Sequence, residues 1–417
     1  MKVILTRIRN GILYYAKMFV KWIAIALLVG AISGFVGFAF YFMVRLCTDT
    51  RIKHEWLIYL MPAGAAGIAF LYKITNSEGL GTNEVIDSIH FGDKIPTRLI
   101  PVIFISTVIT HLFGGSAGRE GAALQIGGGI GCHTGKLLKL DEKDMRLITL
   151  CGMSALFSAL FGLPVTATIF ALEVISVGVL YYSGFVPCII GSATALGITG
   201  LLGAKREAFV IEPMGMDIMT TVRIIILGIL CALVSIVFCE AMHHVEKRFR
   251  LSVKNKIIRG LIGGAILIGM TLIFGTAYNG TGESVIAAAI AGEHIFGFSF
   301  FIKILFTAVS LGCGFKGGEI VPSFFIGACF GNAFGALIGL PPGAAAALGL
   351  VAMFCGAFNC PLAAIMLSIE MFGAGNLLYF AIVCGISYML SGYFGIYRSQ
   401  KIVYSKLKAE FINRYTR

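Results

Sequence analysis

The chain alternates long apolar runs with short polar or glycine-rich breaks. Residues 23–44, 224–241 and 257–274 are apolar over lengths close to the roughly 20 residues with which a helix crosses a bilayer. A barrel strand would need about 10 residues of alternating apolar and polar character, and these runs do not alternate. The pattern therefore predicts an all-α integral membrane protein.

Composition agrees with this prediction and adds detail. Hydrophobic residues make up 58% of the 417 residues and charged residues 13%, against roughly 45–50% and about 25% in soluble domains. Glycine makes up 53 of the 417 residues, about 13%, whereas its average share is about 7%. Glycine lets membrane helices pack closely and supplies turns where helices break inside protein. We expect many tilted and broken helices, and eleven cysteines that act as small buried residues rather than disulfides.

The net charge of +12 is distributed as a topology signal rather than as one nucleic-acid-binding face. Residues 1–21 hold five bases and no acid, residues 243–259 hold six bases against one acid, and the tail from residue 398 does the same. All three regions are expected in the cytoplasm, whereas the mixed-charge link at 203–217 is expected outside. The sequence predicts a multi-pass protein of the inner (plasma) membrane with both termini cytoplasmic and no cleaved signal.

Two pairs of segments repeat in the same order. Gly118, Gly127 and Gly131 have the spacing of Gly318, Gly327 and Gly331, and residues 164–173 match residues 361–370 from proline to glutamate. Because one half starts inside and the link lies outside, the second half must be inverted, as in secondary transporters. The boundaries we expect are a basic N-terminus at 1–21, a first membrane repeat at 22–202, a linker at 203–219, a second repeat at 220–396 and a C-terminal end at 397–417.

The glycine-rich segment 114–131 contains Arg119 and Glu120, two ionisable residues in a chain that keeps charges out of its apolar runs. A charge inside a membrane is a functional hypothesis by default. The apolar run after it can start a helix whose N-terminus attracts an anion. Segment 316–331 repeats this arrangement, with Pro322 suited to a first helical turn. Two such ends facing each other would form an anion site.

Other interpretations of these segments remain open. The glycines can serve helix packing only, and Arg119 and Glu120 can form a structural ion pair. Residues 131–137 lack the glycine spacing and the Ser or Thr of a phosphate loop. No HExxH pattern or paired Cys and His spacing occurs, so we expect no metal and no other cofactor.

Several motifs resemble those of the CLC family of chloride channels and proton-coupled antiporters. GREGA at 118–122 is similar to its GREGP motif, KGGEIVP at 316–322 to its GxFxP segment, and GLGTN at 79–83 to its GSGIP segment. Residues 164–173 resemble the helix that leads to the internal proton glutamate, and IVYS at 402–405 resembles the end that carries the anion-binding tyrosine. The resemblance implies a homodimer with one pathway in each subunit, a CLC-type inverted repeat, and no regulatory CBS domains after Tyr404.

Departures from the family pattern bear on the ion. In chloride-selective members the serine of GSGIP donates to the anion, whereas Leu80 stands there and has no donor. Glu319 precedes Ile320 in the third motif, and Val174 stands where chloride antiporters carry their internal glutamate. These features resemble the fluoride-exporting bacterial branch, although that branch usually has Met or Asn at Leu80 and Thr at Val321. The anion-binding residues implied are Leu80, Gly81, Gly118, Arg119, Gly121, Ile320, Val321 and Tyr404.

The function expected from these features is fluoride export in exchange for protons. Ionised Glu120 would compete with the anion for helix-end donors, and protonated Glu120 would leave them. Tyr404 would close the inner side, unless it is an interfacial anchor. Glu319 would gate or carry protons, unless it only offsets a helix dipole. The rivals are a chloride/proton antiporter or anion channel on the same scaffold, and a membrane enzyme or receptor; we expect no enzyme.

Fluoride itself makes demands on such a site. It is small and strongly hydrated, so its site must supply close donors or the positive edges of aromatic rings. Phe324 and Phe325 follow Pro322 directly, and each can line the pathway or serve packing. The partners expected are thus fluoride or chloride, protons, the lipid bilayer and a second copy of the chain, with no nucleic acid.

Overall fold

The computed structural model describes residues 2–92, 95–204, 209–215 and 217–417, with side chains from residue 10 onward. The first half of this described chain forms α1 (Lys2–Lys53), α2 (Met61–Ile74), α3 (Thr82–Phe91), α4 (Leu99–Phe113), α5 (Glu120–Leu137), α6 (Glu142–Phe161), α7 (Pro164–Glu173) and α8 (Phe185–Leu201). The second half forms α9 (Ile218–Ser252), α10 (Lys256–Phe274), α11 (Glu283–Ile290), α12 (Ser299–Cys313), α13 (Ile320–Leu337), α14 (Pro342–Phe358), α15 (Pro361–Phe372) and α16 (Leu377–Leu390). Short 3-10 helices lie at Glu55–Leu60, Tyr182–Gly184 and Thr276–Tyr278. The predicted helical class is confirmed.

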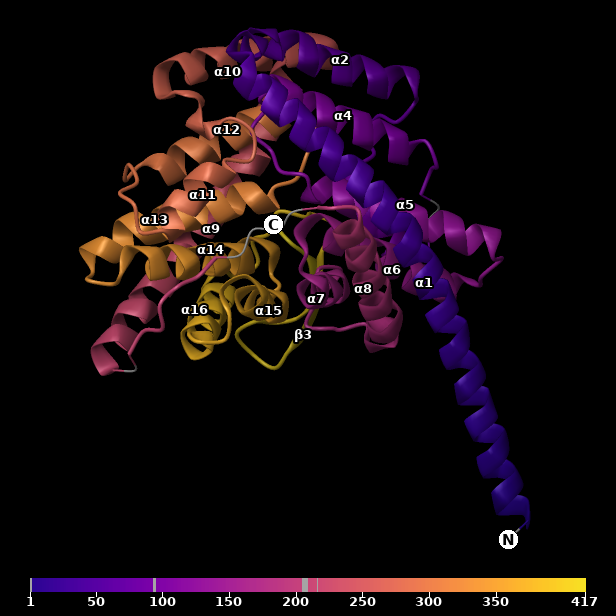
Figure 1. The fold of residues 1–417 in the computed structure, drawn as a ribbon. Helices are drawn as coiled ribbons and strands as arrows, with labels where there is room; N and C mark the ends of the chain where they lie inside the picture. Colours follow the sequence, from indigo (N-terminus) through magenta and orange to yellow (C-terminus); the bar gives the residue numbers. More distant parts are fainter. Residues whose placement is uncertain (1, 93–94, 205–208, 216) are drawn as a thin grey trace.

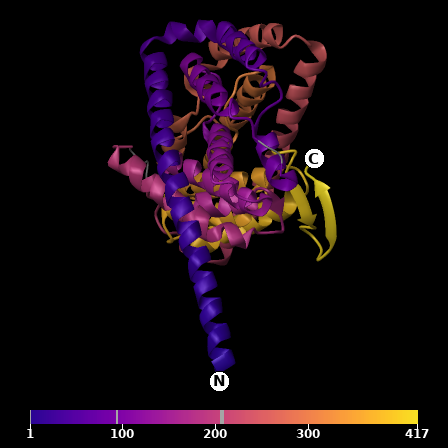
Figure 2. The same ribbon diagram turned by 90° about the vertical axis from the view of Figure 1, so that its right-hand side faces the viewer.

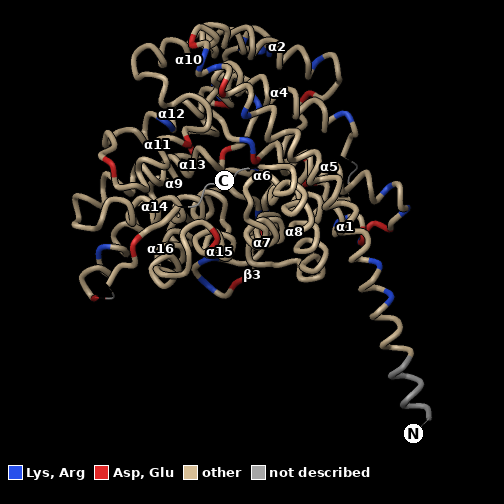
Figure 3. The backbone as a smooth tube through the Cα atoms, in the orientation of Figure 1, with Lys and Arg blue, Asp and Glu red and all other residues tan. Residues whose placement is uncertain are grey.

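Helix lengths follow the expected mixture of spanning and broken helices. Seven helical segments of the described chain are long and apolar enough to cross a membrane, including Asn10–Lys53, Ile218–Ser252 and Lys256–Phe274, which contain the three apolar runs of the sequence. Shorter apolar helices of 10–17 residues, such as Pro164–Glu173 and Leu377–Leu390, lie between them. In both views α1 crosses the body and its N-terminal end extends beyond it (Figures 1 and 2). Lysines mark this protruding stretch in Figure 3.

The two halves repeat one design helix by helix. α4 and α12 each have 15 residues and start at 99 and 299, and α5 and α13 each have 18 residues and start at 120 and 320. The offset is 200 in both cases, as the glycine pattern predicted. The linker boundaries remain a prediction; α8 ends at Leu201 and α9 begins at Ile218.

The inversion is visible where α7 and α15 meet. The carboxylate of Glu173, the last residue of α7, accepts hydrogen bonds from the Leu362 and Ala363 amides at the start of α15 (3.2 and 2.9 Å). Glu370 near the end of α15 accepts hydrogen bonds from the Val165 and Thr166 amides at the start of α7 (3.0 and 2.8 Å). Each glutamate thus satisfies orphan donors of the other helix. This exchange requires antiparallel helices, which is what an inverted repeat provides.

Close helix packing explains part of the glycine pattern. A side chain at Gly127 on α5 would collide with the carbonyl of Gly152 on α6, and one at Gly327 on α13 would collide with the carbonyl of Gly349 on α14. Both helix pairs therefore approach to backbone contact, as small residues allow in membrane proteins. The packing interpretation holds for these glycines. All eleven cysteines are free and buried, as expected.

A small sheet is an addition that the sequence did not predict. β1 (Ser176–Val177), β2 (Lys401–Tyr404) and β3 (Phe411–Tyr415) lie in the order β1-β2-β3. Ser176 pairs with Lys401 in parallel, and Lys401 pairs with Tyr415 antiparallel. The C-terminal end therefore folds back onto the end of α7, at one side of the body in Figure 2.

Candidate anion and proton site

The two glycine-rich segments meet inside the protein as a short antiparallel bridge. The Gly118 amide donates to the Gly318 carbonyl (2.8 Å), and the Gly318 amide donates to the Gly118 carbonyl (2.9 Å). Two residues beyond the bridge, α5 begins at Glu120 and α13 begins at Ile320. The bridge therefore brings two helix N-termini together, each with unpaired amide donors and a partial positive charge.

Glu120 lies at this junction and is fully buried. Neither carboxylate oxygen has a hydrogen-bond partner of normal geometry among the described residues. The carboxyl group nonetheless lies near the amides of Arg119, Glu120 and Val321, and it fills the space where a side chain on Gly118 would project. A buried carboxylate held over two helix N-termini occupies a position that suits an anion. We call this position the seat.

Arg119 and Glu319 hold equivalent positions in the two repeats, since each is the N-cap of its helix. Glu319 is partly buried, and one of its oxygens has no hydrogen-bond partner within the described ranges. It interacts electrostatically with Glu120 and Lys316. Arg119 instead forms an ion pair with Glu283 (3.9 Å). The structure therefore gives Arg119 a partner other than Glu120, so the alternative of a closed Arg119–Glu120 pair does not describe this site.

A cavity of about 800 Å³ leads toward the junction. Arg119, Val321 and Phe324 line it, together with Arg51 and the linker residue Phe209. The Arg119 guanidinium also lies 5.4 Å from the ring centroid of Tyr41 and 5.7 Å from that of Phe161. Because Phe209 belongs to the linker that we expect outside, this cavity is the expected outer vestibule.

The start of α3 adds a third helix end to the site. Gly81 is the N-cap of α3 in extended backbone conformation, and the neighbouring Leu80 is partly buried against the core. Thr82 accepts a hydrogen bond from the Gln125 side chain of α5 (3.1 Å). A side chain on Gly121 would approach both Thr82 and the Gly317 carbonyl. The GLGTN segment and the two bridge segments therefore lie together, as their motifs predicted.

The structure does not bring Tyr404 to this junction. Its side chain is 48% exposed on β2 and packs edge-on against Phe411 at 5.8 Å. Tyr397 is 2% exposed, its hydroxyl has no hydrogen-bond partner among the described residues, and it interacts electrostatically with both Glu319 and Glu120. Tyr397, and not Tyr404, is therefore the buried tyrosine near the two carboxyl groups.

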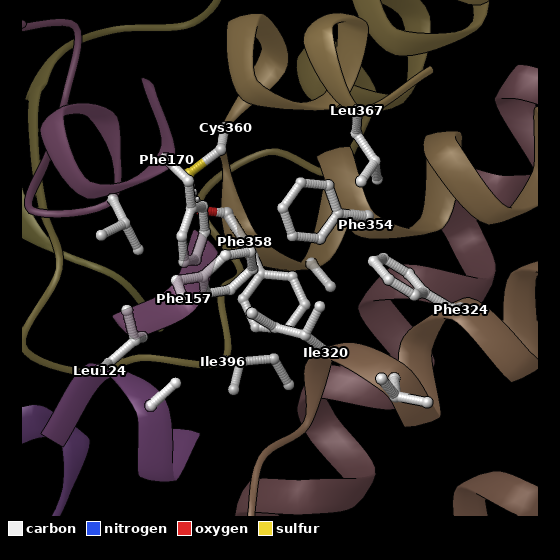
Figure 4. Packing of buried hydrophobic residues seen from close by; sticks show 14 of the residues in the cluster. Leu124, Phe157, Phe170, Ile320, Phe324, Phe354, Phe358, Cys360, Leu367 and Ile396 are labelled. Atoms are coloured by element: carbon white, nitrogen blue, oxygen red, sulfur yellow. Dashed lines mark hydrogen bonds between the residues drawn. The ribbon is translucent and has the colours of Figure 1, made fainter. Parts of the chain in front are cut away.

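Aromatic rings of α7 and α14 pack together around the start of α13 (Figure 4). Phe354 and Phe358 of α14 face Phe170 of α7, with ring centroids 5.6 and 6.4 Å from that of Phe170. The Phe358 ring lies 5.4 Å from Tyr397. Ile320, the first residue of α13, points into the same cluster in Figure 4. Residues from both repeats thus form one apolar wall beside the carboxyl groups.

Two basic residues, one buried and one partly buried, were missed by the sequence analysis. Lys303 on α12 is fully buried and donates to the carbonyls of Tyr278 (3.0 Å) and Gly280 (2.7 Å). Arg51 at the end of α1 donates to the carbonyl of His111 (3.2 Å). Both basic side chains lie near the vestibule, where positive charge favours anions over cations. Lys303 could have been found as a lone charge within an apolar run.

Inverted repeats, broken helices that meet end to end, and buried carboxyl groups at that meeting point define a polytopic membrane protein of the transporter class. A family model described as "Voltage gated chloride channel" matches residues 63–392, which is most of the chain. The chain belongs to this family, the CLC family, and is an anion/proton antiporter or anion channel.

Named relatives agree with this assignment. The "Chloride/fluoride channel protein" of Pseudomonas syringae pv. tomato is 34% identical over 396 residues, covering 93% of this chain and 87% of the relative. An H(+)/Cl(-) exchange transporter of Vibrio campbellii is 27% identical over 380 residues, covering 83% and 81%. The crystal structure of a CLC-type fluoride/proton antiporter superimposes with a TM-score of 0.88 at 30% identity, covering 91% of this chain and 98% of the other.

Proposed function

We propose that the protein exports fluoride in exchange for protons. The observation that carries this proposal is the buried carboxyl group of Glu120, which lies over the bridge between Gly118 and Gly318 and has no hydrogen-bond partner in the described part of the chain. A carboxylate at two helix N-termini competes with any anion for the same donors. A single titrating group in that place links anion binding to protonation.

Glu120 alternates between two states in this mechanism. Ionised, its carboxylate occupies the seat near the Val321 amide and excludes the anion. Protonated, it loses the charge that the helix dipoles attract, and the seat accepts fluoride. Because the proton and the anion bind in linked steps, an inward proton gradient drives fluoride outward.

Glu319 and Tyr397 complete the proposed site. Both interact electrostatically with Glu120. Two carboxyl groups in one low-dielectric site disfavour simultaneous ionisation, so Glu319 supplies a second place for the proton. The unpartnered hydroxyl of Tyr397 donates to the anion on the inner side, the role that the sequence assigned to Tyr404.

The assignment to fluoride rests on what surrounds the seat. Leu80 offers no hydroxyl to a larger halide. The ring of Phe358 lies beside Tyr397, and the ring of Phe354 lies beside Phe358, so their positive edges can face a small anion. The solved fluoride/proton antiporter that resembles this chain supports the same choice. From the family resemblance of the motifs we also propose a homodimer, and from the basic residues near both ends of the chain we propose that both termini lie in the cytoplasm.

Fluoride efflux from proteoliposomes tests the proposal. Purified protein should release fluoride much faster than chloride, and a fluoride gradient should move protons uphill. A chloride rate equal to the fluoride rate would contradict the ion assignment. The second candidate is a fluoride channel, favoured by the name of the Pseudomonas relative; it predicts fluoride flux without uphill proton movement.

A further inference from the structure

The turn that carries Tyr397 is fastened to the side of α3. The Ser399 amide donates to Oδ1 of Asn83 (3.1 Å), and the Ser399 hydroxyl donates to Oδ2 of Asp87 (2.8 Å). Tyr397 and Ser399 share one turn, because the Gln400 amide donates to the Tyr397 carbonyl (3.0 Å). We propose that Asn83 and Asp87 are positioning residues that hold Tyr397 against the pathway through Ser399. This inference rests on the proposed role of Tyr397, and we call the three residues Asn83, Asp87 and Ser399 the α3 latch.

The sequence spacing makes α3 suited to this task. Asn83 and Asp87 are four residues apart and so lie one turn above each other on one helix face. One turn further on, the ring of Phe91 lies 4.9 Å from the Lys401 ammonium. Three residues on one side of α3 therefore contact the chain that follows Tyr397. Asn83 stands at the last position of GLGTN, where the family motif has a proline, which has no acceptor in its side chain.

The turn has other attachments besides the α3 latch. Gln400 donates to the carbonyls of Val174 (2.9 Å) and Phe358 (2.8 Å), which fixes the end of the turn. On the opposite side Arg398 pairs with Glu246 (3.7 Å), and both side chains are about half exposed. An exposed ion pair of this kind contributes little. Ser399, by contrast, is 7% exposed, and its bond to a carboxylate is charge-assisted.

The latch connects the two sides of the site through one helix. The N-terminus of α3 lies against α5, where Thr82 accepts from Gln125, and the side of α3 holds the Tyr397 turn. A displacement of the turn therefore moves Tyr397 relative to Glu120 and Glu319, with which it interacts electrostatically. Tyr397 then no longer closes the inner side, and anions pass without coupling to proton movement.

Coupling measurements on latch variants test this proposal. In Asp87→Ala and in Ser399→Ala, the number of anions moved per proton should rise about tenfold or more, which is the factor expected for one lost hydrogen bond to a charged group. Asp87→Asn keeps an acceptor oxygen and should restore the ratio toward the wild-type value. Arg398→Ala removes the exposed pair of the same turn and serves as the matched control with an unchanged ratio.

Hydrogen exchange of residues 396–401 in the full-length protein supplies a readout that does not depend on transport. Exchange there should accelerate in Asp87→Ala and not in Arg398→Ala. The proposal is wrong if exchange accelerates while the anion-to-proton ratio stays at the wild-type value, or if exchange does not change. Wild-type protein that moves anions without protons would instead refute the antiport function, and the exchange result would still report on the latch.

Discussion

Substitution of Gly118 by alanine blocks the position of the Glu120 carboxylate and leaves the ionisable group itself unchanged. The three heavy atoms nearest to a Cβ built on Gly118 all belong to the carboxyl group of Glu120. Gly118 has no positive φ angle, so alanine fits its backbone. The added methyl group therefore fills the seat and leaves the fold intact. The same methyl group excludes an anion that would take the place of the carboxylate.

The size of the effect follows from overpacking. Adding a methyl group to a packed interior costs about 1–3 kcal/mol, and this cost falls on the seated carboxylate because a side chain can move where backbone cannot. A free-energy cost of that size lowers the population of the state with a seated carboxylate about 5- to 150-fold. Proton-coupled fluoride exchange in Gly118→Ala should fall by a factor in that range, with a melting temperature close to that of the wild type.

Gly318 provides the matched control on the other strand of the bridge. A Cβ there meets the backbone nitrogens of Gly121 and Glu120 in addition to the Glu120 carboxyl group. Gly318→Ala must therefore strain the bridge and should lower thermal stability, whereas Gly118→Ala should not. Proteoliposome exchange and thermal unfolding in detergent measure both quantities. Gly118→Ala protein with the wild-type exchange rate and proton stoichiometry would refute the proposed seat.

Three further substitutions address the roles of single residues. Glu120→Gln removes the titrating group and should abolish uphill proton movement on a fluoride gradient; intact coupling would return Glu120 to a structural role. Glu319→Gln should slow exchange in a protein that remains folded by size-exclusion chromatography, and normal transport would leave Glu319 only its helix-end charge. Leu80→Ser restores a hydroxyl donor and should raise chloride flux relative to fluoride flux, so two unchanged fluxes would show that Leu80 does not face the anion.

Local pattern was enough to predict the membrane class and the duplication, and to indicate a candidate site. Apolar length identifies spanning helices because a bilayer offers no partner for exposed backbone. The glycine spacing at Gly118 and Gly318 indicated which segments correspond, and an ionisable residue such as Glu120 among small residues indicated the site. Each of these patterns lies within a few neighbouring residues, so it can be recognised without knowledge of the fold.

Only the tertiary structure decided which residues meet across the repeats. Tyr397 and Tyr404 both follow the last helix, and nothing local distinguishes them; the path of the chain buries one beside Glu120 and leaves the other on a sheet. The two bonds from Ser399 to α3 join residues more than 300 positions apart. The partner of Arg119 likewise depends on the second repeat, where Glu283 lies. Contacts between distant segments are set by packing of whole helices, which no short stretch of sequence encodes.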